Sequence, residues 1–341
     1  MSISKTIFIR ADANSHIASG HIMRCLTIAG ALRRQGCKVT FLISDADSEK
    51  ALALRGESSF LCLHGNYQNL EEELPALLPL LQEKKPDCFL LDSYFASALY
   101  MSSVRNCCKL AYLDDLQAFD YPADLIINYD LTANASMYGN TPSLTGASYT
   151  PLREQFRSVP YQIRKEVFDL LISTGGSDNH NAASKIFHVL RNSEDFAPYL
   201  GICHILTGDM NPHKEALYAL CARYPQIALH ENITEMAALL SSCDLAFSAG
   251  GTTLFELCAV GVPTISFSVS DEQYNCVHAF EQAGKIPYAG DVRSGIPFYE
   301  TLLAKGIQMA KDLDQRIRLS AFMRQLVDGN GADRIAQALV S

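Results

Sequence analysis

Short apolar runs alternate with stretches of helical spacing along the first 128 residues. Runs without polar alternation are typical of strands buried on both faces of a parallel sheet. Each run is followed by apolar residues three and four positions apart, which is the spacing of a helix that covers such a sheet. The alternation predicts an α/β domain with helices on both faces of a parallel sheet. The predicted strands cover residues 6–9, 37–43, 60–63, 87–92, 109–113 and 124–128.

The pattern lapses over residues 129–165, where prolines and small polar residues show no clear period. Such composition indicates a connection between domains. The alternation then restarts, and Thr234 is expected to cap a helix over residues 235–241. We therefore expect two domains, residues 1–158 and 159–341, with the last helices packing back toward the first domain. The later strands are predicted at residues 167–173, 202–206, 226–230, 244–248 and 263–267, and helices from residue 298 onward.

Composition narrows the classes of function. The chain of 341 residues can bury two cores, and it has neither an apolar run of transmembrane length nor the N-terminal pattern of a signal peptide. Its eleven cysteines form no C-x-x-C pair, which indicates reduced thiols, so we expect a cytoplasmic protein without a membrane anchor. The net charge of −9 argues against nucleic acid and anionic membrane surfaces as partners. No spacing of histidines and carboxylates is typical of a metal site, so we expect no metal.

The first candidate for chemistry is the loop between the first predicted strand and the first predicted helix. Ligands bind at the carboxyl ends of strands in α/β sheets, and Gly20 would let the backbone come close to one. His21 follows at the start of the helix, where the helix dipole favours a neutral imidazole that can act as a base. A lone histidine at a helix cap is usually an ordinary surface residue. The neighbouring Arg10, Asp12 and Arg24 form a polar cluster that favours a functional role.

Two Gly-Gly turns in the second half lie between a predicted strand and a predicted helix. They are Thr174–Ser177 and Ala249–Thr253, and neither is a Walker A loop or a G-x-G-x-x-G fingerprint. Glycines, hydroxyls and helix N–H groups in such turns are suited to phosphate oxygens, although α/β proteins also need such turns structurally. Glu256 follows Thr252 by one helical turn, where its carboxylate could accept hydrogen bonds from both hydroxyls of a ribose.

Several of these segments resemble a known family. Gly250–Ile265, followed by Asp271–Asn275, is similar to the nucleotide-sugar motif of MurG-like glycosyltransferases of the GT-B fold. The segment Ser19–Cys25, Ser-Gly-His-Ile-Met-Arg-Cys, resembles a narrower group, the PseG family of UDP-sugar hydrolases of pseudaminic acid biosynthesis. The resemblance spans nearly the whole chain. Further similar segments are residues 91–94, 113–116, 123–128, 146–156 and 327–332.

The resemblance implies a GT-B enzyme with two Rossmann-like domains and an active site in the cleft between them. It implies metal-independent, cofactor-free hydrolysis of UDP-2,4-diacetamido-2,4,6-trideoxy-β-L-altropyranose, with inversion, for a flagellin or other surface glycan. His21 would be the general base. Substrate contacts would come from Arg10, Asp12, Gly20, Arg24, Asp92, Tyr94, Gln273 and Asn275. UDP contacts would come from Gly175, Gly176, Ser177, Asn181, Ile233, Ser248, Gly250, Gly251, Thr252, Thr253 and Glu256.

Two other functions remain open on the sequence alone. A glycosyltransferase could use the same UDP-sugar site with an unidentified acceptor, and a non-catalytic protein could merely bind the nucleotide sugar. The first domain lacks the apolar and basic patch of a membrane-associated transferase, which favours the hydrolase. A binding protein needs no base, so His21 argues against it. Asp12, Asp92 and Tyr94 end predicted strands, where they orient water or sugar or simply cap loops, and we interpret Asp114 and Asp115 as structural.

Overall fold

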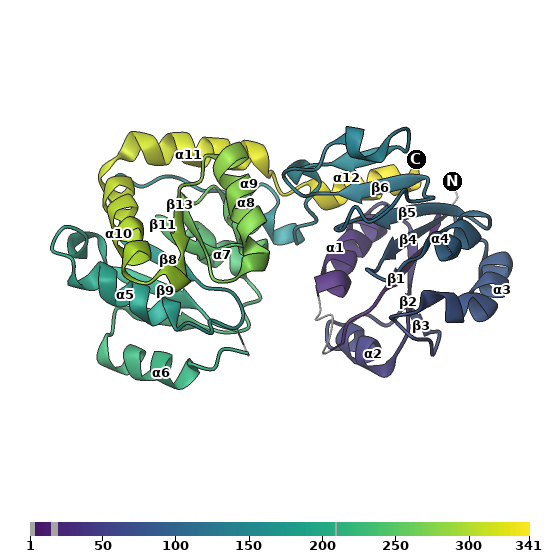
Figure 1. The fold of residues 1–341 in the computed structure, drawn as a ribbon, viewed down its shortest axis with the longest axis horizontal. Helices are drawn as coiled ribbons and strands as arrows, with labels where there is room; N and C mark the ends of the chain where they lie inside the picture. Colours follow the sequence, from purple (N-terminus) through teal and green to yellow (C-terminus); the bar gives the residue numbers. More distant parts are fainter. Residues whose placement is uncertain (1–3, 15–19, 209) are drawn as a thin grey trace. The chain divides into compact units, whose positions relative to one another are not determined.

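The computed structural model describes residues 4–14, 20–208 and 210–341, so Ser19 of the N-terminal motif lies outside the described residues. The chain divides into two compact units (Figure 1). The N-terminal unit comprises Met1–Arg153 and Asn330–Ser341, and the C-terminal unit comprises Glu154–Gly329.

The N-terminal unit is built on a parallel sheet. Within the described residues its seven strands run in the order β3-β2-β1-β4-β5-β6-β7. The strands are β1 Thr6–Ala11, β2 Lys38–Ile43, β3 Phe60–Cys62, β4 Cys88–Asp92, β5 Lys109–Leu113, β6 Leu125–Asn128 and β7 Ser143–Thr145. The helices are α1 Gly20–Arg34, α2 Ala46–Ala53, α3 Leu74–Lys84, α4 Ala98–Arg105 and α12 Gly331–Val340. Two clusters of buried side chains cover the two faces of this sheet, so its central strands are buried on both sides.

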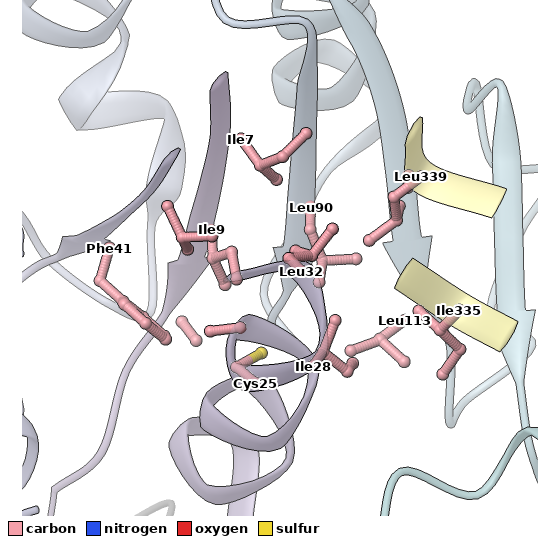
Figure 2. Close-up of a cluster of buried hydrophobic side chains, with 14 of the residues drawn as sticks. Ile7, Ile9, Cys25, Ile28, Leu32, Phe41, Leu90, Leu113, Ile335 and Leu339 are labelled. Atoms are coloured by element: carbon pink, nitrogen blue, oxygen red, sulfur yellow. The ribbon is translucent and has the colours of Figure 1, made fainter. Parts of the chain in front are cut away.

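The last helix of the chain completes the N-terminal unit. Ile335 and Leu339 of α12 belong to the same buried cluster as Ile28 and Leu32 of α1, and Figure 2 shows them facing that cluster. An ion pair of 2.7 Å between Arg34 Nη2 and an oxygen of Asp333 joins the two helices at their exposed side. The apolar stripe of α12 is thus buried against a unit that begins some three hundred residues earlier in the sequence.

The C-terminal unit is built on a second parallel sheet. In this part of the described chain six strands run in the order β10-β9-β8-β11-β12-β13. The strands are β8 Asp169–Ser173, β9 Ile202–Leu206, β10 Ile227–His230, β11 Leu245–Ala249, β12 Thr264–Ser268 and β13 Tyr288–Asp291. The helices are α5 Ala182–Asn192, α6 Lys214–Arg223, α7 Met236–Ser241, α8 Thr252–Val260, α9 Tyr274–Gly284, α10 Ile296–Lys311 and α11 Leu313–Leu326.

Both sheets follow the Rossmann strand order, with the N-terminal sheet extended by one strand. In each sheet the order reverses beside the first strand, between β1 and β4 and between β8 and β11. Ligands of such folds bind outside the carboxyl ends of the strands at this switch point. The prediction of two Rossmann-like parallel sheets is confirmed.

Three local predictions differ from the structure. The edge strands β7 and β13 were not predicted, because both are short and only partly buried and therefore lack an apolar run. Thr234 does not cap α7, which begins at Met236. The side chain of Gln155 takes this place, since its Oε1 accepts the N–H of Ala237 at 2.8 Å and its Nε2 donates to the carbonyl of Thr234 at 2.8 Å.

Candidate active site

The switch point of the N-terminal unit brings His21 and Asp92 together. His21 lies in the first turn of α1, directly after β1, and Asp92 is the last residue of β4, paired in register with Ala11 at the end of β1. His21 Nδ1 lies 2.5 Å from Asp92 Oδ1, and both side chains are buried. An ionised carboxylate only accepts hydrogen bonds, so the proton of a neutral His21 lies on Nδ1 and its Nε2 carries the free electron pair.

Arg24 holds Asp92 in this position. Its Nε donates to Asp92 Oδ2 at 2.7 Å and its Nη2 to Oδ1 at 2.6 Å. The same guanidinium donates to both oxygens of Asp115 at 2.9 and 2.7 Å and to the hydroxyl of Tyr129 at 2.8 Å. These five bonds use the five N–H groups of an arginine. Arg24 was predicted to contact the substrate. In the structure its donors are bound to protein groups, and it supports Asp92.

The charge state of Asp92 follows from these contacts. Burial alone would raise the pKa of Asp92, but the positive charge of Arg24 and the hydrogen bonds from Arg24 and His21 hold it well below its ordinary value. Asp92 therefore remains ionised at any pH near neutrality, and it accepts hydrogen bonds from Arg24 and His21.

A second buried network lies around Arg10. Its guanidinium is fully buried and binds Asp12 at 2.6 Å and Glu73 at 2.9 Å. Asp12 also accepts the N–H of Ser44 at 2.7 Å, and the hydroxyl of Tyr100 donates to Glu73 at 2.7 Å. Arg10 was predicted to contact the substrate, but its fully buried guanidinium is not accessible to a ligand. It holds Asp12 in position instead.

A small hollow lies beside His21. Its volume is about 10 Å³. The ring of Tyr94 packs edge-on against that of His21, with ring centres 4.4 Å apart, and 46% of Tyr94 is exposed. The predicted residues Asp12, His21, Asp92 and Tyr94 thus meet at one place. The residues around the hollow are Asp12, His21, Tyr67, Asp92, Ser93, Tyr94 and Phe95.

The switch point of the C-terminal unit has a different composition. The turn after β8 carries Gly175 with φ +84°, and a Cβ at Gly208 would lie 2.5 Å from the carbonyl oxygen of Gly176. The loop after β9 therefore packs directly on this turn. A cavity of about 120 Å³ joins the turn to the loop after β12. It is surrounded by Thr174, Gly175, Gly176, Ser177, Asn179, His180, Val269, Ser270 and Gln273.

The two helices that follow the Gly-Gly turns start differently. The carboxylate of Asp178 accepts the N–H groups of Ala182 and Ala183 at 2.7 and 3.1 Å, so α5 is capped by the chain's own negative charge. No side chain of the described residues caps α8, which begins at Thr252 after Gly251 with φ +139°. A helix start of this kind leaves backbone donors for an anion.

The other residues predicted to bind UDP occupy varied positions. Ser248 is fully buried and its hydroxyl donates to the carbonyl of Ala249, so its side chain does not face a ligand. Glu256 is buried on α8, one turn after Thr252. Asn181 has a left-handed backbone, and its Oδ1 is buried without a hydrogen-bond partner among the described residues.

Four more predicted residues lie at the edges of these sites. Gln273 borders the cavity of the C-terminal unit, and its Oε1 accepts the N–H of Val269 at 3.0 Å. Asn275 is exposed on α9, and Ile233 is half-buried in the turn between β10 and α7. Gly20 is exposed at the start of α1, where a Cβ would meet no described atom within 4 Å.

Asp115, which the sequence indicated as structural, follows β5 and accepts two hydrogen bonds from Arg24. Residues that the sequence did not single out also contribute to the N-terminal site. Tyr67 and Phe95 follow β3 and β4 and pack edge-on, with ring centres 5.7 Å apart. Nothing in their sequence surroundings distinguishes them from other loop aromatics.

The described residues contain no group of three or more histidine, cysteine, aspartate or glutamate side chains placed to hold a metal ion. Within the same residues, no helix has the length and apolar character required to cross a bilayer.

Comparison with known proteins finds distant relatives in sequence and similar folds among solved structures. No protein-family model matches the chain. The spore coat polysaccharide biosynthesis protein SpsG of Bacillus subtilis is 28% identical, over 97% of this chain and 96% of its own length. The UDP-2,4-diacetamido-2,4,6-trideoxy-β-L-altropyranose hydrolase of Campylobacter jejuni is 27% identical, over 67% of this chain and 80% of its own length.

Solved structures settle the fold class. MurG of Acinetobacter baumannii superposes with a TM-score of 0.73 over 98% of this chain and 99% of its own, at 14% sequence identity. The fold is GT-B, as predicted. At this identity the likeness is one of fold alone. The chain is thus a distant relative of the Campylobacter hydrolase on a MurG-like fold.

Proposed function

We propose that this protein is a hydrolase that releases UDP from a UDP-activated diacetamido sugar. The observation that carries the proposal is the buried arrangement of His21, Asp92 and Arg24, which leaves Nε2 of His21 as a base beside a small hollow. The likeness to the Campylobacter hydrolase supports UDP-2,4-diacetamido-2,4,6-trideoxy-β-L-altropyranose as the substrate. The name of the Bacillus relative supports a role in making a surface polysaccharide.

In the proposed reaction, a water molecule attacks the anomeric carbon of the sugar. Nε2 of His21 takes a proton from this water while its oxygen forms the new bond to carbon. The bond between that carbon and the oxygen of the β-phosphate breaks, and the electron pair leaves with UDP. The ionised Asp92 stabilises the imidazolium, which later returns its proton to solvent. Attack from the face opposite UDP inverts the anomeric centre.

The leaving group needs no protein acid. UDP spreads its negative charge over two phosphates, and oriented backbone donors stabilise it further. We propose that Gly175, Gly176 and Ser177, together with the start of α8 after Gly251, hold these phosphates. In the same proposal Glu256 accepts the ribose hydroxyls. Backbone groups of Ile233 contact the uracil, and no metal or cofactor takes part.

A glycosyltransferase is the second candidate. The MurG-like fold supports it, since the same base could activate an acceptor hydroxyl in place of water. The two functions differ in one measurable respect: a hydrolase releases UDP without any acceptor, whereas a transferase requires one.

The test measures UDP release by the purified protein, with EDTA present and no acceptor, from the diacetamido altrose nucleotide and from UDP-GlcNAc. We expect UDP release from the diacetamido altrose nucleotide only. NMR of the newly formed sugar should show the inverted anomeric configuration. His21→Asn should lower the rate about 10²–10⁴-fold, the usual contribution of a general base, and retain UDP binding. His64→Asn changes an exposed histidine of the same unit and should leave the rate unchanged. A protein that binds UDP and releases none from either sugar nucleotide would overturn the hydrolase in favour of the transferase.

A further inference from the structure

The hollow beside His21 has room for a water molecule. The space open to the centre of a water-sized sphere is about 10 Å³. A bound water also requires two to four polar partners. The imidazole of His21 and the carboxylates of Asp12 and Asp92 all border it. The hollow can therefore hold one water molecule next to the proposed base.

The floor of the hollow is rigid. Asp92 is bound at both oxygens by Arg24, and Asp12 is bound by the fully buried Arg10 and by the backbone of Ser44. Moving either carboxylate would break buried ion pairs, and leaving a buried charge without its partner is strongly unfavourable. The polar side of the hollow is therefore held in place by these bonds.

The remaining walls are aromatic. Tyr94 packs against His21, and Tyr67 packs against Phe95 with ring planes at 77°. Tyr67 comes from the loop after β3, whereas Tyr94 and Phe95 come from the loop after β4. Since the two loops meet through this aromatic pair, Tyr67 and Phe95 limit the space that an acceptor could occupy.

We propose that Tyr67 and Phe95 determine the choice of nucleophile by leaving room for water and excluding the carbon skeleton of an alcohol. This inference rests on the proposed hydrolase and deepens it, because it assigns residues that keep a MurG-like fold from transferring the sugar. An alcohol oxygen at the position of the water carries at least one carbon, and in this proposal that carbon meets the rings of Tyr67 and Phe95, which border the hollow. Repulsion at such contacts is steep, since protein interiors are closely packed.

The test compares hydrolysis with alcoholysis in water–methanol mixtures. Free sugar and methyl glycoside are separated by mass, and the measured quantity is the ratio of the two products. The parent protein should give free sugar. Phe95→Ala and Tyr67→Ala should each raise the fraction of methyl glycoside about tenfold or more, the discrimination that one methylene-sized change in a pocket provides.

Two control variants isolate the effect of shape. Phe119→Ala removes an aromatic ring of the same unit with matching exposure, 38% against 37% for Phe95, and should not change the product ratio. Tyr67→Phe retains the ring without its hydroxyl and should preserve the selectivity for water. Melting curves establish which variants are folded, and Phe95→Leu replaces Phe95→Ala if the latter is not.

The outcomes separate this inference from the proposed function. Folded Phe95 and Tyr67 variants that release UDP but give only free sugar would overturn the inference and leave the hydrolase intact. A parent that forms methyl glycoside as readily as Phe95→Ala would do the same. Absence of UDP release by the parent in both water and methanol would overturn the hydrolase itself.

Discussion

The two switch points of this molecule share one strand order and carry opposite chemistry. In the N-terminal unit, Asp92 at the end of β4 forms an ion pair with Arg24 of α1 and a short hydrogen bond with His21 of the same helix. In the C-terminal unit, the ends of β8 and β11 hold glycine turns, and α8 starts without a side-chain cap among the described residues. One site presents fixed charges, and the other presents backbone donors.

The difference shows what each kind of chemistry requires of the same fold. A base must keep one protonation state and one orientation, so its partners are ionised groups that are themselves held by other charges. A diphosphate brings its own negative charge, so its site needs N–H groups that the protein has not already paired. The carboxyl ends of parallel strands can meet both requirements with different residue types.

The largest expected effect tests the charged site. Asp92→Asn leaves the shape of the side chain but removes the charge that fixes the Nδ1 proton of His21 and pairs with Arg24. We expect turnover to fall about 10³–10⁴-fold, as for the orienting aspartate of a Ser-His-Asp triad, with UDP affinity unchanged by calorimetry. Asp120→Asn changes an exposed aspartate of the same unit and should leave both quantities unchanged. Turnover within tenfold of the parent would show that Asp92 does not orient the base.

An intermediate effect tests the glycine turns. Gly175 and Gly36 have nearly the same φ, +84° and +82°, and a Cβ at either would meet no described atom within 4 Å. Alanine at each position should lower the free energy of unfolding by about 1–2 kcal/mol, because side chains disfavour this backbone region. Only Gly175→Ala should raise the Kd for UDP, about tenfold, or about 1.4 kcal/mol. Equal UDP affinity in the two variants would remove Gly175 from the phosphate site.

The smallest expected effect is a pH dependence of stability that arises in the C-terminal unit. His204 on β9 and His230 on β10 lie 2.9 Å apart, Nδ1 to Nε2. Burial lowers the pKa of His204, and burial together with the neighbouring charge of His204 lowers that of His230. The folded state thus binds fewer protons than the unfolded state near pH 6, so this contribution to stability is full above about pH 6.5 and is lost as pH falls.

Denaturant unfolding between about pH 7 and pH 5 measures this contribution. The parent should lose more stability over this interval than the double variant His204→Gln, His230→Gln. The ion pairs around Asp92 should persist, because its pKa lies well below this range. An identical pH dependence in the parent and the double variant would contradict the assignment to the histidine pair.

Much of this architecture follows from local patterns in the sequence. The buried central strands are mostly apolar, so their pattern located them, and Asp92 was predicted at the end of one of them. The strand order that brings His21 and Asp92 to one switch point comes from the structure. Patterns of this kind depend only on neighbours in the chain. The short edge strands β7 and β13 are partly exposed and carry no such pattern.

The rest depends on contacts between distant residues. Thr234 is a good capping residue, yet Gln155 binds the start of α7 from far along the chain. The polar cluster around Arg10 was evident, but its partner Glu73 lies in a segment that reads as an ordinary amphipathic helix. For this reason the sequence could identify Arg10 and Arg24 as part of the site and could not distinguish support from ligand contact.

The position of α12 has a consequence for how the protein is made in the cell. The ribosome synthesises the whole of Glu154–Gly329 before it reaches Asn330–Ser341, the segment that covers the face of α1 around Ile28 and Leu32. Domains generally fold in order of synthesis, the first before the second. In this chain the order of completion is reversed. The N-terminal unit keeps an apolar face open until α12 has been synthesised, so a chain that terminates before Asn330 exposes that face.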